Sequence, residues 1–144
     1  MSNIEFSYTD GGRAAAGYKG TAGDCVARAI AIASGLNYAD VYTRLADGNA
    51  SQRGKKRGRT ARSGIQVNRK WFKDYMTAIG FVLTPTMAVG SGCTVHLRAD
   101  ELPSGRLVVM VSKHAVAVIN GVIHDTHDCS RNGTRCVYGY WMLT

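Results

Sequence analysis

Asn120 and Gly121 separate two apolar segments, AVAVI at 115–119 and VIHDT at 122–126. An Asn-Gly pair between two such segments is the strongest short-range signal for a β-hairpin, because both central positions of a type I′ turn need a positive φ. A two-residue turn also fixes which residues of the two strands face each other. The pair therefore predicts an antiparallel hairpin with one defined register.

This register determines on which face of the sheet each histidine near the turn lies. His114 is expected to face His127, and Val116 to face Asp125, so that His114, Asp125 and His127 share one face of the sheet while His124 points to the other. His114 and Asp125 become diagonal neighbours, a separation of roughly 7–8 Å that two side chains can close. The turn thus predicts a hydrogen bond between a histidine and a carboxylate.

Three helices are expected before these strands. The segment 25–35 is apolar almost all round, which is typical of a buried central helix, and Gly35 marks its end. Asn37 is a suitable N-cap for a second helix that extends to about residue 45. A stripe of large apolar side chains at helical spacing predicts a third helix over 67–79. The expected core contains Val26, Ile30, Ala33, Trp71, Tyr75, Val109, Val111 and Val118.

Strands are expected near 107–111, 115–119, 122–126 and 137–143, and residues 1–23 show no clean period. Helices that precede strands favour an α+β fold, with the helix at residue 25 packed on an antiparallel C-terminal sheet, over the face that carries His114 and Asp125. The chain has 144 residues, the usual size of one domain. A single domain over 1–144 is therefore expected.

The positive charge is concentrated in one segment. The chain has 18 basic and 10 acidic residues, a net charge of +8, and a loop without apolar periodicity is expected at about 47–64. This loop carries Arg53, Lys55, Lys56, Arg57, Arg59 and Arg62. It is interpreted either as a solvated loop or as a contact for nucleic acid or an acidic protein partner; it has no aromatic residue among the basic ones for base stacking.

The sequence shows no secretory signal and no apolar run long enough to span a bilayer, so a cytoplasmic protein without membrane partners is expected. In that compartment the four cysteines are expected to be reduced thiols. Cys129 and Cys136 flank a second Asn-Gly pair that would place them opposite each other, where a disulfide or a zinc pair is conceivable, but free thiols are favoured. Cys93 lies in a Gly-rich turn and is interpreted as a loop thiol.

Cys25 opens the predicted buried helix. Unpaired N–H groups and the positive end of the helix dipole lower the pKa of a thiol at that place, although a small buried cysteine without chemistry fits the position equally well. The combination with a His–Asp pair later in the chain favours chemistry. Cysteine hydrolases need a thiolate nucleophile, a base and a carboxylate that orients the base.

The order Cys25, His114, Asp125, with the segments GDCVARAIAIASG and LPSGRLVVMVSKHAVAVINGVIHDT, resembles the papain-like cysteine peptidase superfamily, especially its small bacterial and phage-type members. The resemblance covers about two thirds of the chain. It implies that Cys25 is the nucleophile, His114 the general base and acid, and Asp125 the orienting residue. No cofactor is implied.

One departure concerns the oxyanion hole. Members of this superfamily commonly have Gln about six residues before the cysteine, where this chain has Lys19. Either the Cys25 backbone N–H acts with Thr21, Lys19 or another donor, or hydrolysis is weak or absent. Asp24, directly before the nucleophile, is a further candidate for positioning.

Three functions follow as hypotheses. The leading one is a thiol hydrolase or acyl-transfer enzyme acting on a peptide, isopeptide or amide bond of a peptide or protein substrate. The main alternative is a non-catalytic papain-like module that uses the basic loop to bind nucleic acid or an acidic partner. A third is a metal site made by His114, Asp125 and His127, with Cys25 as an additional ligand.

Overall fold

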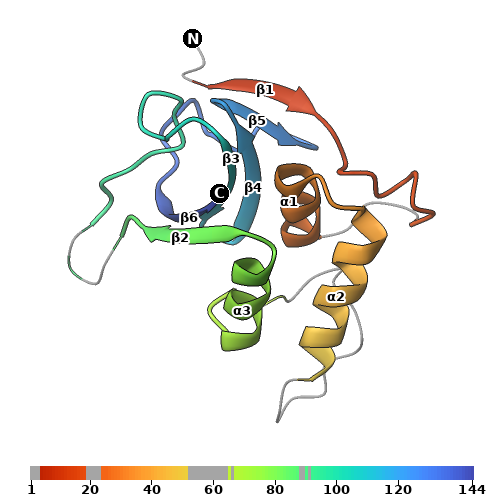
Figure 1. Cartoon of the computed structure of the whole chain (residues 1–144). Helices are drawn as coiled ribbons and strands as arrows, with labels where there is room; N and C mark the ends of the chain where they lie inside the picture. The colour runs from red at the N-terminus through yellow and green to blue at the C-terminus, as the bar shows by residue number, and fades with distance from the viewer. Residues whose placement is uncertain (1–3, 19–23, 52–64, 66, 88–89, 91) are drawn as a thin grey trace.

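The part of the chain that the structure describes folds into an α+β structure with three helices and a six-stranded mixed sheet (Figure 1). This computed structural model describes residues 4–18, 24–51, 65, 67–87, 90 and 92–144. The elements in chain order are β1 (Glu5–Tyr8), α1 (Cys25–Ser34), α2 (Tyr38–Ala50), α3 (Lys70–Ala78), β2 (Phe81–Pro85), β3 (Arg106–Val111), β4 (His114–Ile119), β5 (Val122–Asp125) and β6 (Val137–Leu143). The expected order, helices followed by strands, is confirmed for the main elements.

The strands lie in the order β1-β5-β4-β3-β6-β2. The four predicted strands, β3 to β6, pair antiparallel with their neighbours, as expected. The expectation of a wholly antiparallel sheet is wrong at one edge, because β1 pairs with β5 in parallel. All four residues of β1 are exposed, so the strand lacks the alternation by which a half-buried strand is recognised in a sequence.

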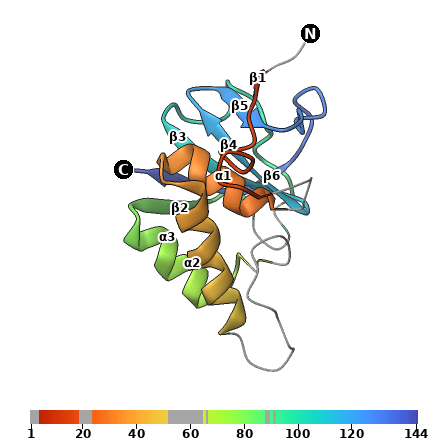
Figure 2. The ribbon, with the colours of Figure 1, turned by 90° about the vertical axis from the view of Figure 1, so that its right-hand side faces the viewer.

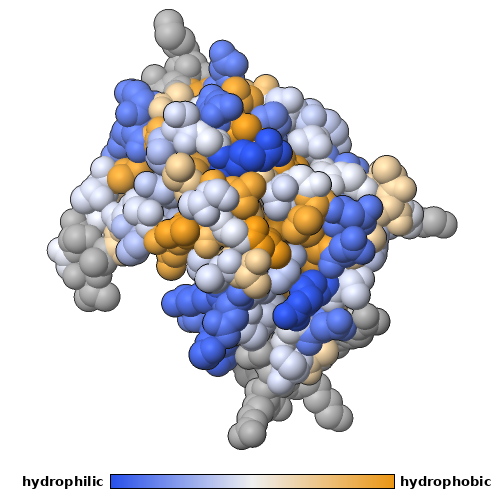
Figure 3. Space-filling model, in the orientation of Figure 1, coloured by the Kyte–Doolittle hydropathy of each residue, from blue (hydrophilic) through white to orange (hydrophobic). Residues whose placement is uncertain are grey.

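The opposite edge strand, β2, was also not predicted, since strand character was expected only after Pro85. Phe81 is buried, and the other four residues of β2 are not. Val82 and Leu83 are among the exposed apolar residues, and Figure 3 shows apolar side chains across the middle of this face of the molecule, in the region where Figure 1 places β2. An edge strand of this kind has little internal pattern, and its backbone pairing with β6 defines it instead.

The helices cover one face of the sheet, the side toward the viewer in Figure 2, and loop segments pack on the other face. Ala115 and Ala117 of β4 pack in the same core cluster as α1. Val116 and Val118, which alternate with them, pack in a second cluster with Leu97 and with other side chains of the loops before β3 and after β5. Every second residue of β4 is thus buried on each side, which explains its continuous apolar run.

The first two helices are joined by a short connection. Gly35 ends α1 with a φ of 76°, and the Asn37 side chain caps α2 by accepting hydrogen bonds from two backbone N–H groups, as predicted. However, α2 continues to Ala50, so the first residues of the expected loop at 47–64 are helical. Gly48 allows the Trp71 side chain of α3 to pack closely on this part of α2, because a Cβ at position 48 would lie 2.2 Å from the Trp71 ring.

The predicted core residues are buried apart from Trp71, which is partly buried and packs at the margin of the helix-side cluster. The third helix begins at Lys70, three residues later than expected. Its most buried side chains are Phe72 and Met76, each fully inaccessible. The apolar stripe was therefore assigned correctly, but its centre is Phe72 and not Trp71.

Cys93 and Cys136 form a disulfide, which corrects the expectation that all four cysteines are reduced. The bridge joins the loop before β3 to the residue that precedes β6, next to an isolated β-bridge between His96 and Cys136. Cys136 is therefore bonded to Cys93 and not to Cys129, which stays a free buried thiol; Cys25 is also free and is partly buried. Within the described residues, no helix has the length and hydropathy that a membrane crossing needs.

Candidate functional site

The hairpin between β4 and β5 has the predicted register. Val118 pairs with Ile123, and Asn120 and Gly121 both have positive φ, at 49° and 78°. His114 is therefore the first residue of β4, and Asp125 is the last residue of β5. The two side chains meet at one end of the sheet, where both strands terminate.

His114 and Asp125 form the hydrogen bond that the register predicts. Nε2 of His114 lies 2.7 Å from Oδ2 of Asp125, and the backbone N–H of Thr126 donates to Oδ1 at 2.7 Å. Burial alone would raise the pKa of Asp125, but these two hydrogen bonds lower it below its ordinary value. Asp125 is thus a buried carboxylate that binds Nε2 of His114, so Nδ1 is the ring nitrogen left for a further contact.

The Cys25 thiol is hydrogen-bonded to the imidazole of His114. Burial alone would raise the pKa of this thiol, but hydrogen bonds with the His114 side chain and the Ala115 backbone N–H, together with nearby positive charge, lower it. Burial alone would lower the pKa of His114, but hydrogen bonds to Asp125 and to two thiols raise it to about 11. These shifts favour a thiolate paired with an imidazolium near neutral pH.

The geometry of this contact differs from the one expected. We predicted that the helix covers the sheet face to which His114 belongs, but α1 covers the opposite face, that of Ala115 and Ala117. Cys25 reaches His114 because it is the first residue of α1 and lies at the end of β4, where the Ala115 N–H is directed to its sulfur. At a strand terminus, a side chain is not confined to one face by neighbouring residues.

A second thiol, Cys129, contacts the imidazole. It is hydrogen-bonded to the His114 side chain and is buried in the core cluster on the loop side of the sheet. The sequence analysis considered Cys129 only as a partner for Cys136 and did not connect it with His114. Its position two residues beyond His127, which the extended register placed opposite His114, was the available signal.

Asp24 lies in a buried network of charges directly before Cys25. Its two oxygens accept hydrogen bonds from Arg13, Arg28 and Tyr38, and Arg28 also bonds to Asp125. Asp24 is 1% exposed. As a carboxylate that only accepts hydrogen bonds, it is not an oxyanion donor, and the positioning role suggested for it is the one that this geometry allows.

His127 completes a group that can hold a metal ion. One donor atom each from His114, Asp125 and His127 lie within 4.8 Å of one another, and the two imidazole rings are 5.2 Å apart. Two features oppose a metal here. The raised pKa of His114 keeps a proton on the ring that a metal must displace, and the Arg28 guanidinium already occupies one oxygen of Asp125.

The remaining predicted site residues lie outside the described residues. These are the two candidate oxyanion donors, Lys19 and Thr21, and the basic residues Arg53, Lys55, Lys56, Arg57, Arg59 and Arg62. Of the predicted site residues, the structure brings together Cys25, His114 and Asp125, and Asp24 is linked to Asp125 through Arg28.

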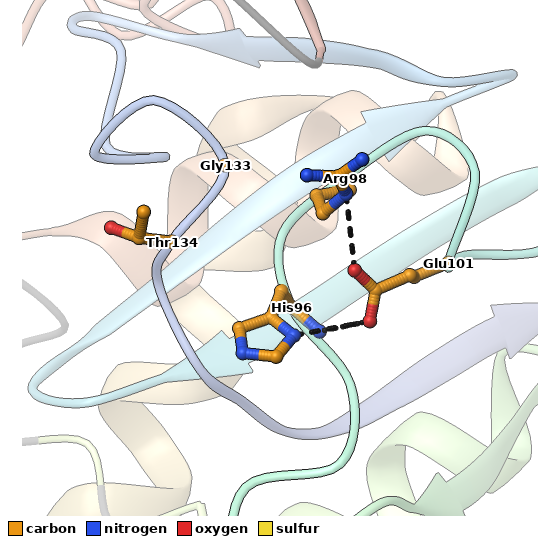
Figure 4. A pocket seen from close by; sticks show the side chains of 5 residues that line it. All are labelled: His96, Arg98, Glu101, Gly133 and Thr134. Atoms are coloured by element: carbon orange, nitrogen blue, oxygen red, sulfur yellow. Dashed lines mark hydrogen bonds and ion pairs between the residues drawn. The ribbon is translucent and has the colours of Figure 1, made fainter.

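His96, to which no role was assigned, belongs to a separate cluster (Figure 4). Its Nδ1 lies 3.1 Å from Glu101, which also pairs with Arg98, and these residues line a hollow of about 310 Å³ with Gly133 and Thr134. The Glu101 carboxylate also accepts a hydrogen bond from the His96 backbone N–H. These contacts stabilise the loop before β3.

Comparisons with protein-family models, with curated proteins and with solved structures find no match to this chain.

Proposed function

We propose that the protein is a cysteine-dependent hydrolase or acyl-transfer enzyme that acts on a peptide, isopeptide or amide bond. Cys25 is the nucleophile, His114 the general base and acid, and Asp125 the residue that orients His114. The observation that carries this proposal is the continuous contact from the Cys25 sulfur to His114 and from His114 Nε2 to Asp125 at 2.7 Å.

The start of α1 and the adjoining ends of β4 and β5 carry the groups that each step of this reaction needs. The Cys25 thiolate attacks the carbonyl carbon of the scissile bond, and the carbonyl oxygen becomes an oxyanion. The first N–H groups of a helix have no carbonyl partner within the helix, so the backbone N–H of Cys25 is the natural first donor to that oxyanion. A second donor is left to Lys19, Thr21 or another group.

Collapse of the tetrahedral intermediate requires a proton on the leaving nitrogen. The imidazolium of His114 donates it, the C–N bond breaks, and an acyl thioester forms on Cys25. Neutral His114 then removes a proton from water, whose oxygen attacks the thioester carbon. The C–S bond breaks, and the acid and the Cys25 thiolate are released. An amine in place of that water gives acyl transfer. Asp125 keeps the proton on Nε2 and stabilises each imidazolium stage.

The papain-like arrangement is part of this proposal. A helix that begins with the nucleophile packs on a sheet whose antiparallel strands carry the base and the orienting acid. We further propose a peptide or protein substrate and a cytoplasmic site of action. The disulfide between Cys93 and Cys136 lies outside the triad, so the chemistry requires only that Cys25 is reduced.

Selective alkylation is the first test. Iodoacetamide near neutral pH is expected to modify Cys25 stoichiometrically, as located by mass spectrometry of the digested protein. The matched control is Cys129→Ser, which removes the other free thiol, so that modification retained in this variant is assigned to Cys25. Because Cys129 contacts His114, the rate in this variant also measures what that contact adds. His114→Ala is expected to abolish the fast reaction, and Cys25→Ser to remove it with the fold retained by circular dichroism.

Turnover is the second test. A library of peptide and amide substrates is screened with the wild-type protein and with Cys25→Ser as the inactive control. Product release by the wild type alone supports the proposal. The proposal is contradicted if Cys25 reacts no faster than an ordinary thiol and no substrate of the library is turned over. The non-catalytic binding module would then be the favoured function.

A further inference from the structure

Arg28 connects the two halves of the candidate site. It lies on α1 one turn after Cys25, and its side chain is 8% exposed. Nη1 bonds to Asp24, the residue directly before the nucleophile, and Nη2 lies 3.2 Å from Oδ1 of Asp125. One buried guanidinium thus contacts both the start of the helix that carries the nucleophile and the end of the strand that carries the orienting acid.

The oxygens of Asp125 are divided between these contacts. Oδ2 bonds to His114, while Oδ1 accepts from Arg28 and from the Thr126 backbone N–H. A carboxylate held on both oxygens has its plane fixed. The orientation of the His114 ring, which follows that plane, therefore depends on Arg28 although Arg28 does not touch the ring's hydrogen bond.

Asp24 is in turn a fixed anchor for Arg28. Its Oδ2 accepts from Arg13 Nη1 at 3.2 Å and from the Tyr38 hydroxyl, which itself lies 2.9 Å from Arg13 Nη1. These residues come from the segment after β1 and from the start of α2. Two further segments thus converge on Asp24 at the N-terminus of α1, and each hydrogen bond of the network restrains the others.

We propose that Arg28 is a positioning residue of this site: its bridge from Asp24 to Asp125 holds the start of α1 against the end of β5 and so keeps Cys25 on the His114 imidazole. The inference rests on the proposed function, and it assigns to a residue outside the triad the task of aligning the triad. The hydrogen bonds of Arg28 to Asp24 and Asp125 act on the triad indirectly, so its role is one of positioning.

Arginine is suited to this task and lysine is not. A guanidinium presents its N–H groups in a planar fork and can bond to two carboxylates at once, whereas an ammonium is a point charge on a flexible stem. The charged groups around it are Asp24, Asp125, His114, Cys25 and Arg13, with the Tyr38 hydroxyl. Removal of Arg28 leaves two buried carboxylates close to Cys25 with less positive charge, which disfavours the thiolate.

The test measures the rate of Cys25 alkylation against pH in the wild type, Arg28→Lys and Arg28→Gln. Arg28→Gln is expected to raise the apparent pKa of Cys25 and, at pH values below that pKa, to slow alkylation by about tenfold for each unit of the rise. Arg28→Lys keeps the charge but loses the bridge, and is expected to fall between Arg28→Gln and the wild type. A merely structural residue would not move this pH profile.

Two further variants separate the effect of Arg28 from a general loosening of α1 and from a failure to fold. Arg106→Gln removes another arginine that holds α1, through bonds from its guanidinium to the Ala33 and Ile32 carbonyls at the far end of the helix. It is expected to lower the melting temperature without moving the pH profile. Should Arg28→Gln fail to fold, the double variant Arg28→Met with Asp24→Asn removes one buried charge of each sign and leaves the net charge near Cys25 unchanged. A smaller rise of the apparent pKa is then expected, from the loss of the bridge to Asp125 alone.

The outcomes separate the inference from the proposed function. A wild-type Cys25 that titrates like an ordinary thiol defeats the proposed function. A wild-type Cys25 with a lowered pKa, combined with Arg28 variants that fold and keep the wild-type profile, overturns the role of Arg28 alone. A profile displaced equally by Arg106→Gln also overturns it, because the effect would then follow from loosening α1 in general.

Discussion

Nε2 of His114 lies 2.7 Å from Oδ2 of Asp125, which joins the first residue of β4 to the last residue of β5. Because this contact orients the imidazole but does not itself move a proton to the substrate, its loss should cost less than loss of the base. His114→Ala is expected to reduce turnover by about 10²- to 10⁴-fold, and Asp125→Ala by a smaller factor. Steady-state rates on one substrate, with Cys25→Ser as the baseline, measure both. Equal losses in the two variants would contradict the orienting role.

The pH dependence follows from the directions of the two pKa shifts. The pKa of Cys25 is lowered, so its thiolate persists below the pH at which ordinary cysteines lose reactivity, and alkylation declines only as the pH falls through that lowered value. The pKa of His114 is raised to about 11, so the imidazolium needed to protonate the leaving group is lost only as the pH approaches that value.

Alkylation and turnover should therefore diverge in alkali. Alkylation needs only the thiolate and is expected to stay fast, whereas turnover is expected to decline with the imidazolium. The two rates measured over the same pH series, with circular dichroism to confirm folding at each pH, test this. Parallel loss of both rates in a folded protein would contradict the assignment of the proton to His114.

The disulfide between Cys93 and Cys136 should stabilise the fold without serving the site. It closes a loop with a sequence separation of 43, for which the loss of chain entropy in the unfolded state predicts a contribution of about 4 kcal/mol to the free energy of unfolding. Cys93→Ser is expected to lower the denaturation midpoint while Cys25 alkylation keeps its wild-type rate. The double variant with Cys136→Ser is the control, and it should add no further loss.

Gly48 is expected to tolerate no side chain. A Cβ at this position would lie 2.2 Å from the ring of Trp71, so Gly48→Ala must displace the contact between α2 and α3. The overpacking should cost about 1–3 kcal/mol in the free energy of unfolding, although alanine is a better helix former than glycine. Denaturant unfolding of Gly48→Ala measures this. A more stable variant would contradict the close packing of Trp71 on Gly48.

The candidate triad was predictable because its parts are tied to local signals. Asn120 and Gly121 define the hairpin, the hairpin register relates His114 to Asp125, and a nearly continuous apolar run predicts the helix that opens at Cys25. Each of these signals depends on a few consecutive residues. None of them required knowledge of how the helices pack.

Contacts between distant segments were missed or misjudged for the converse reason. The parallel pairing of β1 with β5 joins the N-terminal segment to a strand more than a hundred positions later, and β1 carries no apolar alternation that would indicate it. The bridge between Cys93 and Cys136 and the contact of Cys129 with His114 likewise depend on where loops return to the sheet. No short-range pattern specifies such returns.

The sequence by itself thus determined the hairpin, the helix that opens with Cys25 and the alternation that pairs His114 with Asp125, because backbone turn chemistry and hydrophobic periodicity act over a few residues. Only the tertiary structure decided that α1 covers the opposite face of β4, that the site forms at the strand ends, and that Arg28 links Asp24 to Asp125. Such contacts depend on burying complementary surfaces from distant segments, and a buried charge is stable only where its partners converge on it.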